Sequence, residues 1–195
     1  MKKILILLLL LNLNYTNIYA IEADVFVQST VNRAAETLGG GLTKEERMNE
    51  LKKIALETVD IKGIGFYSLG VHRKVVSDSQ KNEYEKAFAE YFLQSFSSRL
   101  AEYSNPIINV ESKKKINENY TIVSSTLAAT EKRPSVKIEW RVYTKNKDQP
   151  LIRDLIIEGL SLARTQKEEF NSIIQSADGD LNVLLDNLRN FSNAN

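Results

Sequence analysis

The spacing of apolar residues changes near Pro106, about half-way along this chain. Over residues 77–103, apolar and aromatic side chains recur every three or four positions, which is the period of an amphipathic helix. Beyond the proline the period becomes two, most clearly in residues 135–144, where apolar side chains alternate with charged or polar ones. The change predicts an α+β fold in which helices precede an antiparallel sheet with one covered face.

The same patterns predict a sheet of about four strands and about six helices. The expected strands are residues 107–111, 120–128, 135–144 and 151–157. The expected helices are residues 24–38, 43–59, 60–70, 77–103, 165–177 and the segment from Asp180 onward. Thr43 with Glu46, and Ser77 with Gln80, have the spacing of a capping box, in which each side chain bonds the other's backbone N–H.

Residues 151–170 connect the last predicted strand to a helix. The apolar run 151–157 is interrupted by Glu158 and Gly159. Thr165 and Glu168 again have capping-box spacing, which predicts that the helix begins at Thr165. We therefore expect this stretch to join the sheet to the helical layer.

The first twenty residues have the pattern of a secretory signal peptide. Lys2 and Lys3 precede eight aliphatic residues, and a more polar stretch ends at Ala20. A run of eight is too short to span a bilayer, which needs about 20 residues. We expect cleavage near Ala20, with Ala23 as a second candidate, and a mature domain of residues 21–195.

Charge limits the kinds of partner expected for that domain, and cysteine content limits how it can be stabilised. The chain has 26 Lys and Arg and 25 Asp and Glu, and removal of Lys2 and Lys3 leaves 24 basic against 25 acidic residues. This balance argues against nucleic acid, whose phosphates require an excess of cations. The chain contains no cysteine, so its stability must come from a packed core.

Few residues are suited to catalysis or metal binding. Without cysteine and with His72 as the single histidine, a zinc site of His and Cys ligands is excluded, and no metal or cofactor is expected. Asp154 and Glu158 suggest a pair of catalytic carboxylates. In a regular strand, however, Asp154 shares a face with Ile152 and Ile156, so we expect it to accept hydrogen bonds from a helix terminus or to pair with an arginine. His72 is expected on the surface or at a cap.

Two segments are candidates for an apolar cavity. The predicted helix 77–103 is aromatic along most of its length, and rigid rings that do not fill the space against a sheet leave room for an apolar ligand. In residues 60–70, Gly63 and Gly65 lie between bulky residues and permit close approach of backbone to another element or to a ligand. A packed core and a tight helix crossing are the alternatives.

The chain resembles the MlaC family, also called the toluene-tolerance family, over nearly all of the mature sequence. The most specific part is residues 154–162, DLIIEGLSL, followed by Phe170 and Ile174. Leu69-Gly70 ahead of the helix 77–103, and the aromatic residues of that helix, also look like the family pattern. One departure is Pro150-Leu151, where the family often has an aromatic residue before the last strand.

The resemblance implies a curved antiparallel sheet wrapped by helices, similar to NTF2 and cystatin-like sheets, with an apolar cavity between the layers. It implies a periplasmic carrier of diacyl phospholipid that works as a monomer and maintains outer-membrane lipid asymmetry. Its expected partners are an inner-membrane ABC-type complex with an MCE-domain protein and an outer-membrane lipoprotein–porin complex. An enzymatic activity is not expected.

The predicted lipid contacts come from the aromatic helix, the glycine-containing element, the third strand and the end of the fourth strand. They are Phe66, Leu69, Phe88, Phe92, Phe96, Trp140, Val142, Ile156 and Leu160. This set depends on strand register, because a shift of one residue exchanges the two faces. Two other functions are compatible with such a cavity: an isomerase or dehydratase using Asp154 or Tyr143, and a periplasmic chaperone or adaptor for peptides.

Overall fold

The structure is a computed structural model that describes residues 21–194. The predicted signal peptide, residues 1–20, lies outside the described residues. In chain order the elements are α1 (Ala23–Gly39), α2 (Lys44–Thr58), α3 (Ile61–Ser68), the 3₁₀ turn η1 (His72–Lys74), α4 (Asp78–Leu100), β1 (Ile108–Asn117), β2 (Tyr120–Leu127), β3 (Val136–Tyr143), β4 (Leu151–Ile157), β5 (Leu160–Ser161), α5 (Leu162–Ser176) and α6 (Leu181–Ala194). The predicted α+β class and six helices are confirmed.

The strands form one antiparallel sheet in the order β1-β2-β3-β4-β5, so each strand pairs with its neighbour in sequence. The sheet has five strands where about four were expected, because β5 is only two residues long. Glu158 and Gly159 make the turn between β4 and β5 with φ of 48° and 83°. Positive φ at both positions is the geometry of a two-residue hairpin turn, which returns the chain to the edge of β4.

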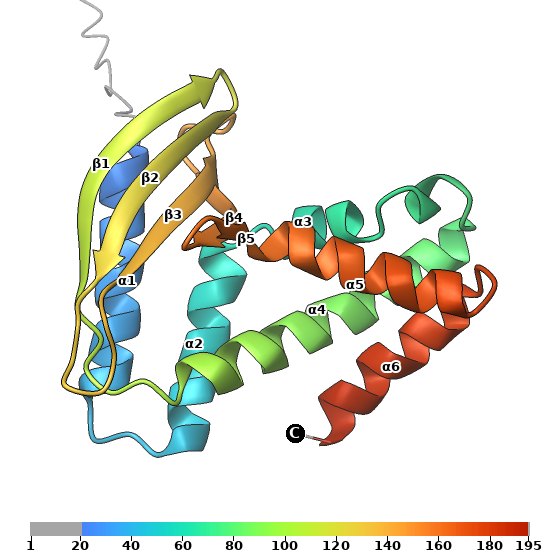
Figure 1. Ribbon diagram of the computed structural model, residues 1–195, viewed down its shortest axis with the longest axis horizontal. Coiled ribbons are helices and arrows are strands. Elements are labelled where there is room, and N and C mark those ends of the chain that lie inside the picture. The colour runs from blue at the N-terminus through green and yellow to red at the C-terminus, as the bar shows by residue number, and fades with distance from the viewer. Residues whose placement is uncertain (1–20, 195) are drawn as a thin grey trace, which may run out of the picture.

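The first hydrophobic core lies between the sheet and α1 (Figure 1). Along β2 and β3 the buried positions alternate with more exposed ones, as the sequence predicts for a sheet covered on one face. The buried members of this sheet–α1 core are Ala23, Val27, Val31, Val123, Leu127, Ile138, Trp140, Val142 and Ile152.

The first strand is longer than its sequence suggests. It was expected to end at Glu111, but β1 continues to Asn117 through three consecutive lysines. One of these, Lys113, reaches α1 and pairs with Glu22 at 2.5 Å and Asp24 at 2.8 Å. The strand continues because its backbone pairs with β2 as far as Asn117, and Lys113 also meets opposite charge at the start of α1.

A second core lies between the remaining helices, which extend away from the sheet (Figure 1). Its buried members come from α3, α4, α5 and α6, with α2 between this group and α1. Both predicted capping boxes are present, at Thr43 for α2 and at Ser77 for α4. Among residues 21–194, no helix has the length and apolar character needed to cross a membrane.

The helix after the last strand begins earlier than expected. Its first residue is Leu162 and its N-cap is Ser161, whose hydroxyl accepts a hydrogen bond from the Arg164 N–H. The predicted cap, Thr165, lies inside the first turn and donates to the Ser161 carbonyl at 3.1 Å. The prediction of a start at Thr165 was wrong because Ser161 is held in place by a residue of β4, a contact that local spacing does not reveal.

Candidate functional site

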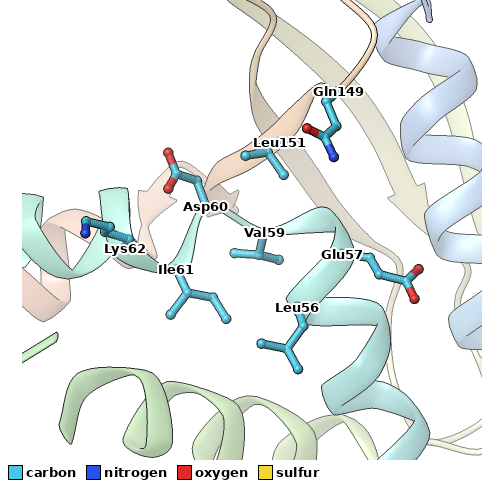
Figure 2. Close-up of a pocket in the computed structure, with 8 residues that line it drawn as sticks. All are labelled: Leu56, Glu57, Val59, Asp60, Ile61, Lys62, Gln149 and Leu151. Atoms are coloured by element: carbon cyan, nitrogen blue, oxygen red, sulfur yellow. The ribbon is translucent and has the colours of Figure 1, made fainter. Parts of the chain in front are cut away.

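A hollow lies where α2 ends, α3 begins and β4 starts (Figure 2). Its volume is about 560 Å³, within the range of known ligand sites. We call it the junction hollow, and its lining residues are Leu56, Glu57, Val59, Asp60, Ile61, Lys62, Gln149 and Leu151. In Figure 2 the side chains of Leu56 and Ile61 point toward α4, so the apolar part of the hollow faces that helix.

The link between α2 and α3 is attached to the free edge of β4. Val59 pairs with Ile152 in a parallel bridge, and the Asp60 N–H donates to the Ile152 carbonyl at 2.9 Å. Asp60 also caps α3 by accepting from the Gly63 N–H at 2.8 Å. A Cβ at Gly63 would overlap the Asp60 carboxylate, so this close cap requires glycine.

Arg153 of β4 holds the same carboxylate from the sheet side. Its Nε donates to Asp60 at 2.6 Å, its Nη1 donates to the Tyr120 hydroxyl at 2.7 Å, and its guanidinium lies 3.6 Å from the Tyr143 ring centre. Burial acts to lower the pKa of Arg153, but the hydrogen bonds to Tyr120 and Asp60 raise it above the ordinary value. The link is therefore fixed to the sheet by a permanent cation.

A second, much smaller hollow lies between α3 and α4. Its volume is about 10 Å³, and it is lined by Lys62, Gly65, Phe66, Tyr84, Glu85 and Phe88. Lys62 belongs to both hollows; its ammonium pairs with Glu85 at 2.9 Å and lies 5.7 Å from the Phe66 ring centre. The first turn of α3 therefore separates the two hollows, and Gly65 allows the Phe88 ring to pack directly on the helix backbone.

Four aromatic rings form a continuous stripe along α4. Tyr84, Phe88, Phe92 and Phe96 are four residues apart, and successive ring centres are 5.7, 6.0 and 5.7 Å apart. Tyr84 and Phe88 are buried, whereas Phe92 and Phe96 are half-buried. The Tyr84 hydroxyl donates to the Gly65 carbonyl at 2.9 Å, and burial raises its pKa, so it stays protonated. We call this set the aromatic stripe.

Comparison with known protein families identifies the chain. The profile described as MlaC protein matches residues 28–190, from α1 into α6. The chain belongs to the MlaC family. A solved structure of similar fold is the phospholipid-binding protein from Ralstonia solanacearum in complex with a phospholipid. It superposes with a TM-score of 0.75 at 18% sequence identity, over 89% of this chain and 98% of that chain.

In this MlaC-family chain the nine predicted contact residues do not share one cavity. Trp140 and Val142 lie in the sheet–α1 core, where the Trp140 indole N–H donates to the Ser125 hydroxyl at 2.8 Å. Leu69 and Phe88 lie in the helical core, with Phe66 and Phe92 packed at its edge. The two sets are separated because α1, and not the aromatic helix, covers the sheet face that contains Trp140.

The last three predicted contacts lie outside both sets of buried residues. Phe96 is half-buried and stacks on Phe92 at an interplanar angle of 9°. Ile156 is half-buried on β4, and Leu160 is 59% exposed in β5. Whether any of the nine touches a ligand stays a prediction.

A β-bulge in β4 decides which of its side chains face α1. The pairing with β3 shifts there, so that Val142 lies opposite Ile152 and Trp140 lies opposite Leu155. Ile152 and Leu155 are three residues apart, yet both pack in the sheet–α1 core. The extra residue at Arg153 shifts the alternation by one position.

The bulge corrects the expected face of Asp154. A regular strand would place Asp154 on one face with Ile152 and Ile156. The bulge leaves Asp154 with Ile156, opposite the exposed Arg141 and Glu139, and puts Ile152 on the face toward α1. Its carboxylate accepts from the Ser161 hydroxyl at 2.6 Å and from the Ala163 N–H at 3.0 Å. The expectation that Asp154 holds a helix terminus is confirmed.

The residues with acid–base chemistry have structural partners. Both Asp154 oxygens are used at the start of α5, and Tyr143 lies under the Arg153 guanidinium. His72 lies in η1, half-buried, with Nε2 3.1 Å from the Asn171 side-chain oxygen. Within the described part of the chain, no group of three or more His, Cys, Asp or Glu side chains could hold a metal ion.

Most of the junction hollow could not be predicted from the sequence. Of its lining, only Asp60, Ile61 and Lys62 belong to a segment that suggested a ligand site, the glycine-containing residues 60–70. Gln149 and Leu151 come from a turn and strand end nearly ninety positions later in the chain. No local pattern brings those two segments together, although Pro150-Leu151 is the place where the chain departs from the family pattern.

Proposed function

We propose that this protein is an exported, periplasmic phospholipid carrier. Membership of the MlaC family is the observation that supports this most directly. The Ralstonia solanacearum protein of similar fold was solved in complex with a phospholipid, which makes diacyl phospholipid the ligand class to test first.

The contacts of α4 suggest where acyl chains would lie. Phe88 packs against Gly65 of α3, and Gln94 accepts from Lys52 of α2 at 2.7 Å. Phe92 lies between these two contacts along α4 and packs at the edge of the helical core. The half-buried end of the aromatic stripe would therefore form the wall of the junction hollow that faces α4, with the acyl chains between them.

The edge of the junction hollow is polar, as a headgroup site requires. Glu57, Asp60, Lys62 and Gln149 line it together with four apolar residues. The ionised groups already have partners: Arg33 for Glu57, Arg153 for Asp60 and Glu85 for Lys62. A lipid bound here would therefore bury no unpaired charge of the protein, and its headgroup would stay in contact with water.

The energetics of carrying a lipid explain why partners are needed and catalytic groups are not. Each buried CH₂ is worth about 0.8 kcal/mol relative to water, so two acyl chains represent on the order of 20 kcal/mol. A lone lipid does not cross an aqueous gap at a useful rate, whereas a carrier that matches the burial offered by a bilayer can exchange lipid with it. Loading and release would be driven by an inner-membrane ABC-type complex with an MCE-domain protein and by an outer-membrane lipoprotein–porin complex.

Native mass spectrometry of protein exported in a Gram-negative host tests the proposal. We expect a monomer with one diacyl phospholipid per chain, and an N-terminus after Ala20 or Ala23 if the predicted leader is removed. A monomer purified from the periplasm without lipid, which also fails to take up lipid from vesicles, would contradict the carrier function. Retention of the uncleaved leader in the cytoplasm would contradict export.

A further inference from the structure

The turn between α3 and α4 exposes a small apolar patch. Val75 is 82% exposed, the highest value among the large apolar side chains of the described residues, and Val71 is 67% exposed. Tyr67, at the end of α3, is 40% exposed. Single exposed apolar residues are ordinary, but two on this short turn, with a third at the end of the preceding helix, suggest a contact surface. This turn lies at the end of the helices farthest from the sheet (Figure 1).

Contacts with α5 fix the inner side of the turn. The His72 ring lies 3.1 Å from the Asn171 side-chain oxygen, and the Lys167 ammonium lies 5.4 Å from the Tyr67 ring centre. Within the turn, the Val75 N–H donates to the His72 carbonyl at 3.0 Å. Because these contacts fix the backbone, exposure of the two valines is part of the folded structure and requires no local unfolding.

Cations surround the exposed valines. Arg73 and Lys74 lie between them in sequence, and both are exposed. Among the described residues, neither forms an ion pair. Lys167 adds a third cation beside Tyr67.

The acidic residues at this end do not cancel that charge within the turn. Asp78 pairs with Lys81 at 3.0 Å, Asp178 and Asp180 belong to the separate turn between α5 and α6, and Glu168 lies on α5 beside Lys167, outside the turn itself. In a mature chain that is nearly neutral, this turn is locally cationic. We call residues 71–75 with Tyr67 and Lys167 the basic tip.

We propose that the basic tip binds the surface of a membrane containing anionic phospholipid. Apolar side chains flanked by Lys and Arg are suited to the boundary between headgroups and acyl chains, where the apolar groups enter and the cations contact phosphate. A tyrosine with a cation above its ring suits the same boundary. A turn at the outer end of the helices can reach a flat lipid surface (Figure 1), whereas a peptide partner is usually held in a groove.

This inference goes beyond lipid carriage and does not depend on it. It does connect to the candidate site, since Phe66, one residue before Tyr67, lines the hollow between α3 and α4. A membrane bound at the tip would lie at the C-terminal end of the helix that separates the two hollows.

Flotation with vesicles tests the proposal on the mature chain, residues 21–195. The probe is phosphatidylcholine vesicles with and without about 30% phosphatidylglycerol. We expect binding to the anionic vesicles that weakens at high salt, because screening shortens the range of the charges. Val71→Asp with Val75→Asp should weaken binding about tenfold or more. Arg73→Ala with Lys74→Ala should weaken it roughly thirtyfold, since each cation near an anionic surface contributes a factor of roughly five.

Matched variants away from the tip provide the controls. Val25 and Ile107 are each 62% exposed on other elements, and their change to Asp should leave binding within about twofold, as expected for surface substitutions. Lys145→Ala with Lys147→Ala removes the same net charge from the turn before β4. The proposal is overturned if the wild-type chain does not bind the anionic vesicles, as a purely protein partner would require, or if the tip variants bind as well as the controls. Native mass spectrometry of the same samples reports internal lipid separately.

Discussion

Gly65 is the position where a single added methyl group should matter most to the helical core. A Cβ there would lie 2.7 Å from Cδ1 of Phe88, a ring that is 2% exposed and packs against Tyr84, Phe92 and Phe170. We expect Gly65→Ala to lower the free energy of unfolding by about 1–3 kcal/mol through overpacking. This loss should outweigh the gain of about 1 kcal/mol that Ala brings to a helix. Urea unfolding followed by circular dichroism measures the change.

Gly41→Ala is the matched control. No atom lies within 4 Å of a Cβ built at Gly41, and its backbone does not require positive φ. Alanine there should leave the unfolding midpoint unchanged or slightly higher, because it restricts only the unfolded chain. Equal midpoints for Gly65→Ala and the wild-type chain would show that α3 and α4 are not in the contact described.

The buried phenol of Tyr84 makes a pH-dependent contribution to stability. Its pKa is raised by burial in the folded state, so the folded chain keeps a proton that the unfolded chain releases above about pH 10. The contribution of Tyr84 is therefore complete below that pH and is lost as the pH rises, by about 1.4 kcal/mol per pH unit. At neutral pH we expect Tyr84→Phe to be less stable by about 1 kcal/mol, because the hydrogen bond from the Tyr84 hydroxyl to the Gly65 carbonyl is lost while the Leu69 N–H still donates to that carbonyl.

The test is the difference in unfolding free energy between the wild-type chain and Tyr84→Phe across this pH range. That difference should shrink above about pH 10 and then change sign. Tyr67→Phe, which removes an exposed phenol from α3, controls for general effects of alkali. A difference for Tyr84→Phe that stays constant with pH would contradict a buried, protonated phenol.

At the scale of elements, β4 holds the starts of two helices through adjacent residues. Arg153 binds the Asp60 cap of α3, and Asp154 binds the Ser161 cap of α5. The bulge places both side chains on the face of the sheet away from α1. The edge of β4 that does not pair with β3 contacts the α2–α3 link in the first half of the strand and β5 in the second half.

A double-mutant cycle on Asp60→Asn and Arg153→Gln measures this attachment. The two side chains are 16% and 30% exposed, so their pairing is only partly screened by water. We expect a coupling energy of about 1–2 kcal/mol from urea unfolding. Asp78→Asn with Lys81→Gln, an exposed pair on α4, should show coupling of about 0.5 kcal/mol or less. Additive effects at Asp60 and Arg153 would mean that the link is not fixed by this pair.

At the scale of the whole molecule, two cores that share few residues should respond differently to substitution. Trp140→Ala leaves a cavity in the sheet–α1 core and should lower the free energy of unfolding by about 3–5 kcal/mol. Its effect on bound phospholipid, compared at equal fractions of folded protein, should be small. Phe92→Glu places a charge on the half-buried part of the aromatic stripe and should lower lipid occupancy severalfold.

Native mass spectrometry gives the occupancy, and circular dichroism gives the folded fraction. Phe96→Glu is a second variant with less effect on the core, since Phe96 is half-buried and packs outside the helical core. If Trp140→Ala loses lipid while Phe92→Glu and Phe96→Glu retain it, the acyl chains lie along the sheet and not along α4.

Patterns within a few residues determined much of this structure from sequence alone. The α+β class, the orientation of Trp140 and Val142 toward the covered face, and the capping boxes at Thr43 and Ser77 were all predictable. Each depends on side-chain period or on a contact three residues away, which the chain specifies locally. The family resemblance is equally local, since its most specific part is the contiguous run of residues 154–162.

Only the tertiary structure decided the arrangement of the site. The bulge at Arg153 and the separation of Trp140 from Phe88 depend on pairing and packing between different elements, and the start of α5 at Leu162 depends on a contact from β4 across the β4–β5 turn. Asp60 and Arg153 are 93 positions apart, yet their contact sets where α3 leaves the sheet and where the junction hollow forms. Local sequence propensity does not predict such pairs, because the two side chains stabilise the fold only after both segments have packed against each other.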